Sequence, residues 1–423
     1  MYVRAGLVIH CLHPDRHMKK NRLLALLVIS VGINYIDRGN LSVAAPDLIR
    51  ELSLSTTQVG LLFSAFFWTY ASFQLLSGWL IDRYNVHWVY GISFLVWTAA
   101  TALIGMVSSF GLLLMLRLLL GAGEAAAYPS CSKIIASDYA EHERGIANAL
   151  VDAASKIGPA LGTLLGGLIV AQMGWRSLFL ILGFGGVLWL PFWFLSKPKH
   201  SEEIRPRTTE GAPGMLQIMR LRSAWGTFLG LFCLNYAWYF LLSWLPYYLV
   251  HERHFSLRMM AVIGSVPFWG LGVSSLIGGW ASDRWILRGG SPTRVRKTFV
   301  VAGLLMCTLL VPAAIVKETW VSMALIITVC LSFGLASSNN WAVTQTLAGP
   351  LAAGKWTGLQ NAIGNLGGVV APYLTGVIVA QTKSFYLAFL AAAVMAVLGA
   401  ISYGLIVGRL ETQNWNSPEN VKA

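Results

Sequence analysis

The feature that most constrains this chain is a series of apolar runs, each long enough to cross a lipid bilayer. A transmembrane helix needs about 20 mostly apolar residues, because the hydrocarbon core is about 30 Å thick. Only 12% of the 423 residues are charged and 56% are hydrophobic, whereas a soluble domain has about 25% charged residues. We predict an all-α membrane protein with twelve transmembrane helices, at roughly 23–47, 57–81, 88–108, 110–135, 145–172, 176–195, 223–250, 258–284, 297–316, 320–346, 355–381 and 384–408.

The basic residues predict how the chain is oriented in the membrane. The net charge is +13, which by itself could suggest a nucleic-acid partner. However, if both termini are cytoplasmic, 22 of the 31 Lys and Arg residues fall in cytoplasmic segments and 6 in external loops. That bias is typical of inner (plasma) membrane proteins. We therefore expect an inner membrane location, both termini in the cytoplasm, and no nucleic-acid partner.

The termini and the cysteines suggest no processing or metal chemistry. Residues 1–17 are too short and polar for a cleaved signal, and we expect the chain to start at Met18. The five cysteines have no metal-binding spacing and are expected to be small apolar filler. No cofactor or metal is predicted, and we expect the protein to be monomeric.

The sequence contains an internal repeat with an offset of 201 residues. The offset aligns Asn34-Tyr35 with Asn235-Tyr236, Gly78-Trp79 with Gly279-Trp280, and Asp82-Arg83 with Asp283-Arg284. Two parallel six-helix bundles follow, and transporters built in this way hold substrate near the midplane between the halves. The predicted segments are a cytoplasmic N-terminus (1–22), the first bundle (23–195), a cytoplasmic linker (196–222), the second bundle (223–408) and a cytoplasmic tail (409–423).

These features resemble a known family of transporters. Twelve spans in parallel halves, with Gly78-x-x-x-Asp82-Arg83 after the second span, are similar to the major facilitator superfamily. The resemblance covers about residues 20–410 and implies the major facilitator fold. It also implies that Asp82, Arg83, Asp283 and Arg284 belong to the gating machinery, with the arginines bridging to neighbouring spans.

A second set of motifs resembles one branch of that superfamily. Tyr35-x-Asp37-Arg38 in the first span, with Arg117 and Glu124 in the fourth, is similar to the anion:cation symporters. This branch includes bacterial hexuronate, galactonate and glucarate transporters and the lysosomal sialic acid carrier. It implies proton-coupled transport of an organic anion.

Arg38 is the candidate anion anchor. Its planar guanidinium matches the geometry of a carboxylate. It could instead be only an internal counter-ion for Asp37 or Glu124. The resemblance assigns substrate binding to this Arg and to a tyrosine at the position of Tyr70, and Tyr35 adds a hydroxyl donor.

Asp37 and Glu124 are the candidate proton sites. A charge inside the membrane is costly, by about 2.5–3.5 kcal/mol on insertion scales, so such residues are functional candidates. Burial raises the pKa of a carboxylate and a nearby cation lowers it, and this competition suits a group that gains and loses a proton. Arg117 lies two turns from Glu124, about 10 Å away along one helix face, so each is expected to have other partners. The resemblance gives both acids a proton-carrying role and gives Arg117 a modulating one.

Asp152 and Lys156 are four residues apart, which suits an ion pair on one face of a helix. Lys156 could be a second anion anchor for the far carboxylate of a dicarboxylic acid. Alternatively, Asp152 neutralises it and the pair only braces the helix. Ser155 adds a hydroxyl on the same polar face, and we include Lys156 and Ser155 among the candidate substrate-binding residues.

The second half offers neutral polar groups in its spans. Amides and hydroxyls suit the hydroxyls of a sugar acid, although such groups also bond helices together in any bundle. The substrate-binding candidates here are Tyr236, Thr346, Asn361 and Asn365.

Together these observations predict a secondary active transporter for proton-coupled uptake of an organic anion, most simply a hexuronate, aldonate or aldarate. Another carboxylate, such as an aromatic acid or a tartrate-like dicarboxylate, or an anion exchanger, remains an alternative. A drug-efflux antiporter is disfavoured by the arginine in the first span. An enzyme is disfavoured because the predicted spans contain no histidine.

Overall fold

The computed structural model describes residues 14–139, 141–196, 213–413 and 415, and these ranges are helical apart from short turns. Much of the predicted segments 1–22, 196–222 and 409–423 therefore lies outside the described residues, as does most of the segment before Met18. The helices are α1 (Pro14–Leu52), α2 (Thr56–Arg83), α3 (Val86–Ile104), α4 (Phe110–Glu124), α5 (Ala127–Asp138), α6 (Glu141–Leu161), α7 (Gly167–Met173), α8 (Trp175–Val187), α9 (Trp189–Ser196), α10 (Met215–Met219), α11 (Arg222–His251), α12 (Leu257–Leu287), α13 (Pro292–Met306), α14 (Leu310–Ile315), α15 (Thr319–Thr382) and α16 (Tyr386–Ile401), with short π or 3₁₀ turns at Gly162–Gly166, Cys307–Leu309 and Ser402–Ile406.

The predicted spans reappear as helices. Among the described residues, ten helices are long and apolar enough to cross a membrane, and the bent pair Thr56–Gln74 and Leu76–Arg83 makes an eleventh. The first predicted span lies in α1, which is absent from this set because Asp37 and Arg38 interrupt its apolar character. The all-helical membrane fold is confirmed, whereas the number twelve depends on α1 crossing despite its charges.

Local sequence signals explain where several helices begin and end. Ser55 caps α2, and its hydroxyl and Gln58 bond each other's backbone amides. Asn85 and Ser256 cap α3 and α12 in the same manner, each accepting from a backbone amide of the first turn. The long stretch α15 is broken at Gly349, where φ is 62°, a conformation that glycine adopts without steric cost. The expected tenth and eleventh spans meet at this break.

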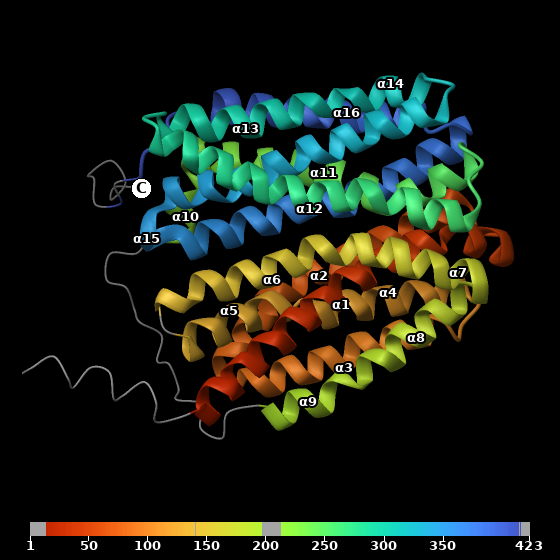
Figure 1. Cartoon of the computed structure of the whole chain (residues 1–423), viewed down its shortest axis with the longest axis horizontal. Coiled ribbons are helices and arrows are strands. Elements are labelled where there is room, and N and C mark those ends of the chain that lie inside the picture. Colours follow the sequence, from red (N-terminus) through yellow and green to blue (C-terminus); the bar gives the residue numbers. More distant parts are fainter. Residues whose placement is uncertain (1–13, 140, 197–212, 414, 416–423) are drawn as a thin grey trace, which may run out of the picture.

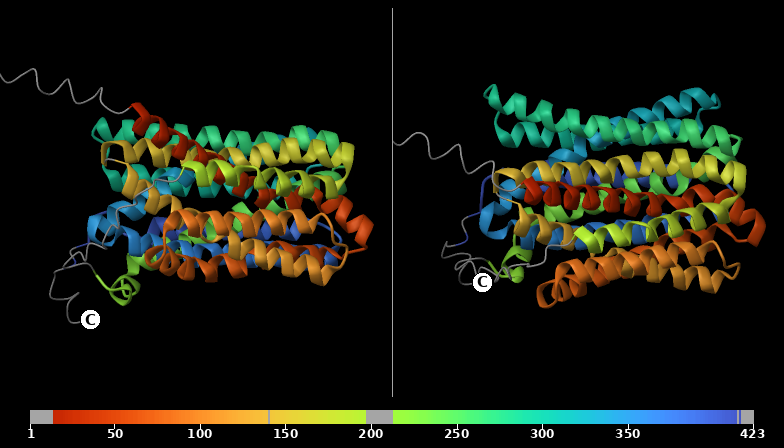
Figure 2. Two further views of the ribbon diagram at one scale, coloured as in Figure 1. Left: turned by 90° about the horizontal axis from the view of Figure 1, so that it is seen from below. Right: turned by 60° about the horizontal axis from the view of Figure 1, so that its bottom comes forward.

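The helices form two groups that follow the two halves of the sequence. Figure 1 shows α1–α9 in the lower part of the molecule and α11–α16 in the upper part. The groups meet where α2 packs on α15, α1 on α11, and α6 on α12. Both views in Figure 2 show the helices running along one common direction. We call the end of the molecule where α9 ends and α10 lies the linker end. The opposite end, which contains the turns at 53–55 and 383–385, is called the far end.

The two groups contact each other closely toward the far end. The Thr56 hydroxyl donates to the Gly376 carbonyl at 3.0 Å, and the Ser64 hydroxyl to the Val369 carbonyl at 2.6 Å. Among the described residues these are the hydrogen bonds that join the groups, and both come from the far-end half of α2. A Cβ added to Gly376 would lie 2.4 Å from the Thr56 carbonyl oxygen, so the backbones meet only because this residue has no side chain. We call this contact the far-end seam.

This contact leads to a first prediction. Gly376→Ala should separate α2 from α15 at the far end, because overpacking a close contact costs about 1–3 kcal/mol. Gly358→Ala is the matched control on the same helix, since a Cβ at Gly358 would meet nothing within 4 Å. We expect spin labels at Ser53 and Lys383 to report longer distances in Gly376→Ala only. Unchanged distances would show that the seam tolerates a methyl group and does not depend on glycine.

Candidate functional site

A buried ion pair joins the first and fourth predicted spans. Arg38 of α1 donates from Nε to Oε2 of Glu124, at the end of α4, over 3.0 Å. Their side chains are 3% and 0% exposed. Such a pair is strongly coupled, because removing either charge leaves the other uncompensated in a low-dielectric interior. The structure thus brings together the expected anion anchor and one of the two expected proton sites.

Aromatic rings enclose the guanidinium of Arg38. Its central carbon lies 4.6 Å from the Tyr35 ring centroid, 4.4 Å from that of Tyr70 and 5.3 Å from that of Phe66. Cation–π contacts of this kind stabilise a cation that has lost its water. Phe66 also lies 5.2 Å from the Arg117 guanidinium and so separates the two cations. The sequence analysis missed Phe66, although it lies one turn from Tyr70 on the same face of α2.

Asp37 and Arg117 have their own local partners. Oδ1 of Asp37 accepts from Nδ2 of Asn40 at 2.9 Å, and Arg117 donates from Nε to the Leu62 carbonyl at 3.1 Å. Both side chains are buried. The carbonyl bond of Arg117 agrees with the expectation that its spacing from Glu124 requires other partners. Four charged groups, two acidic and two basic, therefore share one dry region.

Small residues make this close packing possible. A Cβ on Gly121 would lie 2.1 Å from the Phe66 carbonyl oxygen, and one on Gly158 would lie 2.5 Å from Cβ of Tyr35. Without side chains at these positions, α4 approaches α2 and α6 approaches α1 closely enough to enclose the charges.

Several polar atoms in this region are buried without a hydrogen-bond partner. They are Nη2 of Arg38, Oε1 of Glu124, Nη1 of Arg117, Oδ1 of Asn40 and both side-chain polar atoms of Asn34. Buried polar groups are nearly always satisfied in native proteins, so a cluster of such atoms indicates a place for water, a proton or a ligand. In particular, Nη2 of Arg38 has no hydrogen-bond partner while Nε holds Glu124.

The hydroxyl of Tyr35 faces a residue that the sequence analysis missed. The Tyr128 hydroxyl donates to it at 3.3 Å, and the two rings meet edge to face with centroids 6.3 Å apart. Tyr128 lies four residues after Glu124, and that spacing was the signal available in the sequence. Ser155 is buried beside Tyr128, so α6 completes this side of the site.

The second group of helices contributes neutral groups from α11 and α15. The Tyr239 hydroxyl donates to Oδ1 of Asn365 at 2.9 Å, and the Tyr239 ring lies 4.3 Å from that of Phe67 across the boundary between groups. Tyr239 also lies within electrostatic range of Arg38. The hydroxyl of Tyr236 is buried and has no partner. Of the expected residues, Asn365 is thus linked through Tyr239 to the boundary between the groups, and Tyr236 lies about one turn before Tyr239 on α11.

Other neutral candidates lie elsewhere in α15. Thr346 donates to the Ala342 carbonyl, and its own carbonyl accepts from Thr412, which places it near the linker end. Asn361 is half-buried. A separate, fully buried network holds α15 to α11 and to Tyr403, with Gln360 bonded to Thr344, Asn340 and the Thr227 carbonyl. That network is satisfied internally and braces the second group.

The acids of the repeated loop motif make different contacts from those expected. Asp82 pairs with Lys133 of α5 at 3.2 Å, and Asp283 pairs with Arg296 of α13 at 2.6 Å. In place of the expected arginine bridges to neighbouring spans, Arg83 lies over the Trp79 ring and Arg284 over the Trp280 ring, each on its own helix. The acid therefore makes the bridge in this arrangement, because the arginine side chain extends along the helix surface.

Two histidines, His87 and His251, lie in the end turns of membrane helices, just outside the predicted spans. α3 begins at Val86, two residues before the predicted span, so His87 is buried in its first turn. It packs against the Trp193 ring at 5.5 Å. In the part of the chain that the structure describes, no three His, Cys, Asp or Glu side chains converge as they would around a metal ion.

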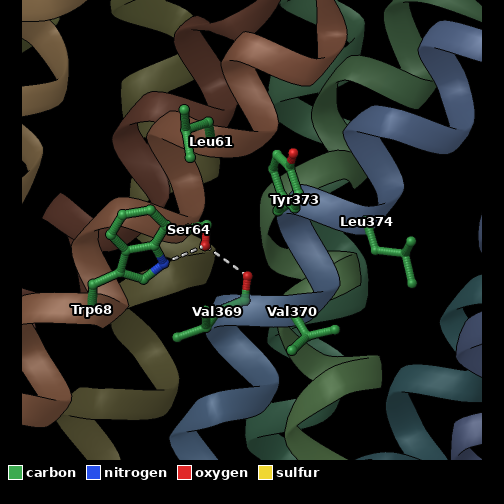
Figure 3. Close-up of a pocket in the computed structure, with 7 residues that line it drawn as sticks. All are labelled: Leu61, Ser64, Trp68, Val369, Val370, Tyr373 and Leu374. Carbon is green, nitrogen blue, oxygen red and sulfur yellow. Dashed lines mark hydrogen bonds between the residues drawn. The ribbon is translucent and has the colours of Figure 1, made fainter.

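A groove on the surface of the seam is not the charged site. It has a volume of about 410 Å³ and is lined by Leu61, Ser64, Trp68, Val369, Val370, Tyr373 and Leu374. Figure 3 shows the Ser64 hydroxyl between the Trp68 indole and the Val369 carbonyl, with apolar side chains around it. Its lining has no charged group to hold an anion, and its apolar rim suits hydrocarbon contact.

Comparison with protein families now decides the identity. Residues 27–372 match the model of the Major Facilitator Superfamily, which is well over half of the chain. The chain belongs to the major facilitator superfamily. It is accordingly a multi-span membrane transporter and not an enzyme.

The similar proteins include named transporters of small acids. The probable galactarate/D-glucarate transporter GudP of Escherichia coli K12 is 29% identical, over 92% of this chain and 93% of its own length. A D-galactonate transporter of Escherichia coli O6:H1 is 29% identical, over 91% and 95%. The probable sulfoacetate transporter SauU of Cupriavidus necator is 31% identical, over 92% and 93%. The names of these relatives confirm the resemblance to sugar-acid transporters.

A solved structure has the same fold. A bacterial homolog of the human lysosomal transporter Spinster, in an inward-facing and occupied conformation, superposes with a TM-score of 0.79. It covers 92% of this chain and 96% of its own, at 19% identity. At that identity the likeness establishes the major facilitator fold alone.

The buried pair gives the second prediction. Arg38→Met or Glu124→Gln alone should destabilise the protein by about 3–5 kcal/mol, because each leaves a buried charge or donor unpaired. The double variant should recover most of this loss, since both charges are then absent. The measurement is thermal unfolding of the four proteins in detergent. Additive losses in the double variant would mean that the two side chains are energetically independent.

Proposed function

We propose that this protein is a proton-coupled symporter that takes up an organic anion of the sugar-acid type by alternating access. The observation that carries this proposal is the buried Arg38–Glu124 pair, in which Nη2 of Arg38 has no hydrogen-bond partner. The relatives named for galactarate, glucarate and galactonate support the class of anion.

The cycle begins with protonation of Glu124. While ionised, this carboxylate occupies Nε of Arg38 and competes with any external anion for the same cation. A proton removes its charge, and Arg38 is then free to hold a substrate carboxylate through its fork. Proton and anion binding therefore strengthen each other, as linkage requires. Asp37 provides a second proton site beside Arg38, and Arg117 keeps the region electropositive.

The remaining contacts orient the substrate. Tyr35 and Tyr70 flank Arg38 and present hydroxyls to the carboxylate end. Tyr236, Asn361 and Asn365 of the second group are assigned to the substrate hydroxyls, and Thr346 to an outer position near the linker end. A substrate held from both groups favours whichever arrangement brings them together, which is how a ligand shifts a two-state equilibrium.

Release reverses these steps on the other side of the membrane. When Glu124 loses its proton, its carboxylate returns to Arg38 and displaces the anion. We assign the paired acids Asp82 and Asp283, with Arg83 and Arg284, to stabilising one of the two arrangements.

The distribution of basic residues supports an orientation for this cycle. We propose that the linker end faces the cytoplasm, both termini included, in the inner membrane. The far-end seam then closes the external side.

Arg38 provides the third prediction. In a thermal-shift screen against sugar acids, aromatic acids and phosphate esters, sugar acids should raise the melting temperature of the wild type and not of Arg38→Ala. Arg50→Ala is the matched control on α1, because its side chain is 79% exposed at the far end. Stabilisation that survives in Arg38→Ala would show that another residue anchors the anion.

Glu124 provides the fourth prediction. Glu124→Gln imitates the protonated state, so it should still exchange labelled substrate across a vesicle membrane. It should not accumulate substrate in response to an imposed pH gradient, because no proton is carried. Glu318→Gln, at the start of α15, is the control and should accumulate substrate normally. Wild-type uptake that is indifferent to the gradient would overturn proton coupling.

A further inference from the structure

Helix α6 exposes two different faces. Ile146, Leu150 and Ile157 are 69%, 44% and 41% exposed and lie on one narrow face, which suits contact with hydrocarbon. Asp152 and Lys156 lie on another face, about 120° away at 100° per residue. Their side chains are 63% and 27% exposed. Exposed charges on a face turned away from the apolar one require an aqueous or polar neighbour.

The charged face of α6 is the face that meets the other group of helices. Farther along the same stripe, a Cβ added to Gly167 would lie 2.5 Å from Cβ of Ala261 in α12, and one added to Gly264 would lie 3.8 Å from the Thr163 side chain. At the level of Lys156, α12 presents Gly272, where an added Cβ would lie 3.6 Å from Cβ of Lys156. Lys156 therefore lies where the close contact ends, and Asp152 lies one turn closer to the linker end. Both face the space between the groups.

Lys156 lies within reach of the anion site. Gly158 packs against Tyr35, and Gly162 packs against Ile36, next to the Asp37–Arg38 pair of residues. Lys156 is six residues before Gly162, which is about 9 Å along the helix axis. Because both basic side chains are long and flexible, an axial offset of this size can be spanned by a ligand that carries an acidic group at each end. The neighbouring Ser155 already contacts the Arg38 side of the site through Tyr128.

The pairing of Lys156 with Asp152 is weak. The nearest approach of Nζ to Oδ1 is 3.9 Å, which is beyond hydrogen-bond distance. Partly exposed ion pairs at this spacing contribute little to stability, so Asp152 leaves the ammonium group of Lys156 able to bind another acid. A ligand carboxylate can therefore compete for Lys156.

The charge balance favours a doubly charged ligand. The mid-span charges among the described residues are the cations Arg38, Arg117 and Lys156 and the acids Asp37, Glu124 and Asp152. With protons on Asp37 and Glu124, the loaded site carries two positive charges in excess. A monoanion leaves one of these uncompensated during the transition, whereas a dianion neutralises both.

We infer that Lys156 binds a second acidic group, so that the substrate class is an organic dianion such as a sugar diacid, with Arg38 and Lys156 holding its two ends. This inference rests on the proposed function, because it extends the same anion site toward the linker end. It distinguishes between the two kinds of acid that the relatives are named for.

The test uses two ligands that differ only at the far end. Galactarate carries a carboxylate where galactonate carries a hydroxymethyl group, and the intervening hydroxyls are the same. We expect Lys156→Met to lose affinity for galactarate by about tenfold or more, the effect of removing one charge-assisted contact. Affinity for galactonate should remain within about twofold. The measurement is isothermal titration of the full-length purified protein at one fixed pH.

Asp152→Asn is the matched control. If the pair only braced α6, Asp152→Asn and Lys156→Met would lower the melting temperature alike and would weaken the binding of galactarate and galactonate equally. That result would show the inference to be wrong. We expect Asp152→Asn to keep or improve galactarate binding, because the ammonium group loses a competitor. If Lys156→Met lost affinity for both acids equally, or for neither, the inference would be overturned while the proposed anion transport would stand. Binding of neither acid by the wild type would overturn the proposed function itself.

Discussion

The cost of holding four charged side chains in a dry interior is the constraint on which the rest of this structure depends. Pairing offsets much of this cost for Arg38 and Glu124, whereas each charge stranded alone would cost several kcal/mol. The aromatic shell of Tyr35, Phe66 and Tyr70 excludes water and replaces part of what the guanidinium has lost. In the proposed cycle, a proton on the acid or an anion on the arginine therefore replaces the partner, and an empty, unpaired state is unfavourable.

The backbone packing converts this local chemistry into a property of the whole molecule. Glycines at 121 and 158 bring α4 and α6 against the helices that carry the charges, while Gly60 and Gly376 let α2 and α15 touch near the far end. The same helix α2 thus carries Phe66 and Tyr70 at the site and Thr56 and Ser64 at the seam. A change in what Arg38 binds acts on α2 directly through its rings, without any longer chain of contacts.

Much of the fold was predictable from the sequence, because apolar length and an internal repeat are one-dimensional signals. The lone exception is instructive: α1 carries Asp37 and Arg38, so the residues that define the site also weaken the signal of the helix that holds them. Within the site, charges were predictable since their cost makes them rare. The partners were not. These contacts depend on how each helix is rotated about its axis, which periodicity does not determine. Examples are the Asp82–Lys133 pair, the position of Phe66 between two cations, and the bonding of Gln360 within the bracing network.

The asymmetry between the repeated halves has a physical reason. In the proposed cycle, a proton and an anion compete for one cation, which requires that the acid and the arginine stay within contact distance throughout and so belong to one rigid group. The second group only needs to sense whether a ligand is present, and neutral groups such as Tyr239 and Asn365 do this with little desolvation cost when the space between the groups closes. A charge placed there would have to be dehydrated at every transition, loaded or empty. Confining the mid-span charges to the first group keeps that barrier low for the loaded protein and leaves the charge of the site itself to decide which ligands can cross.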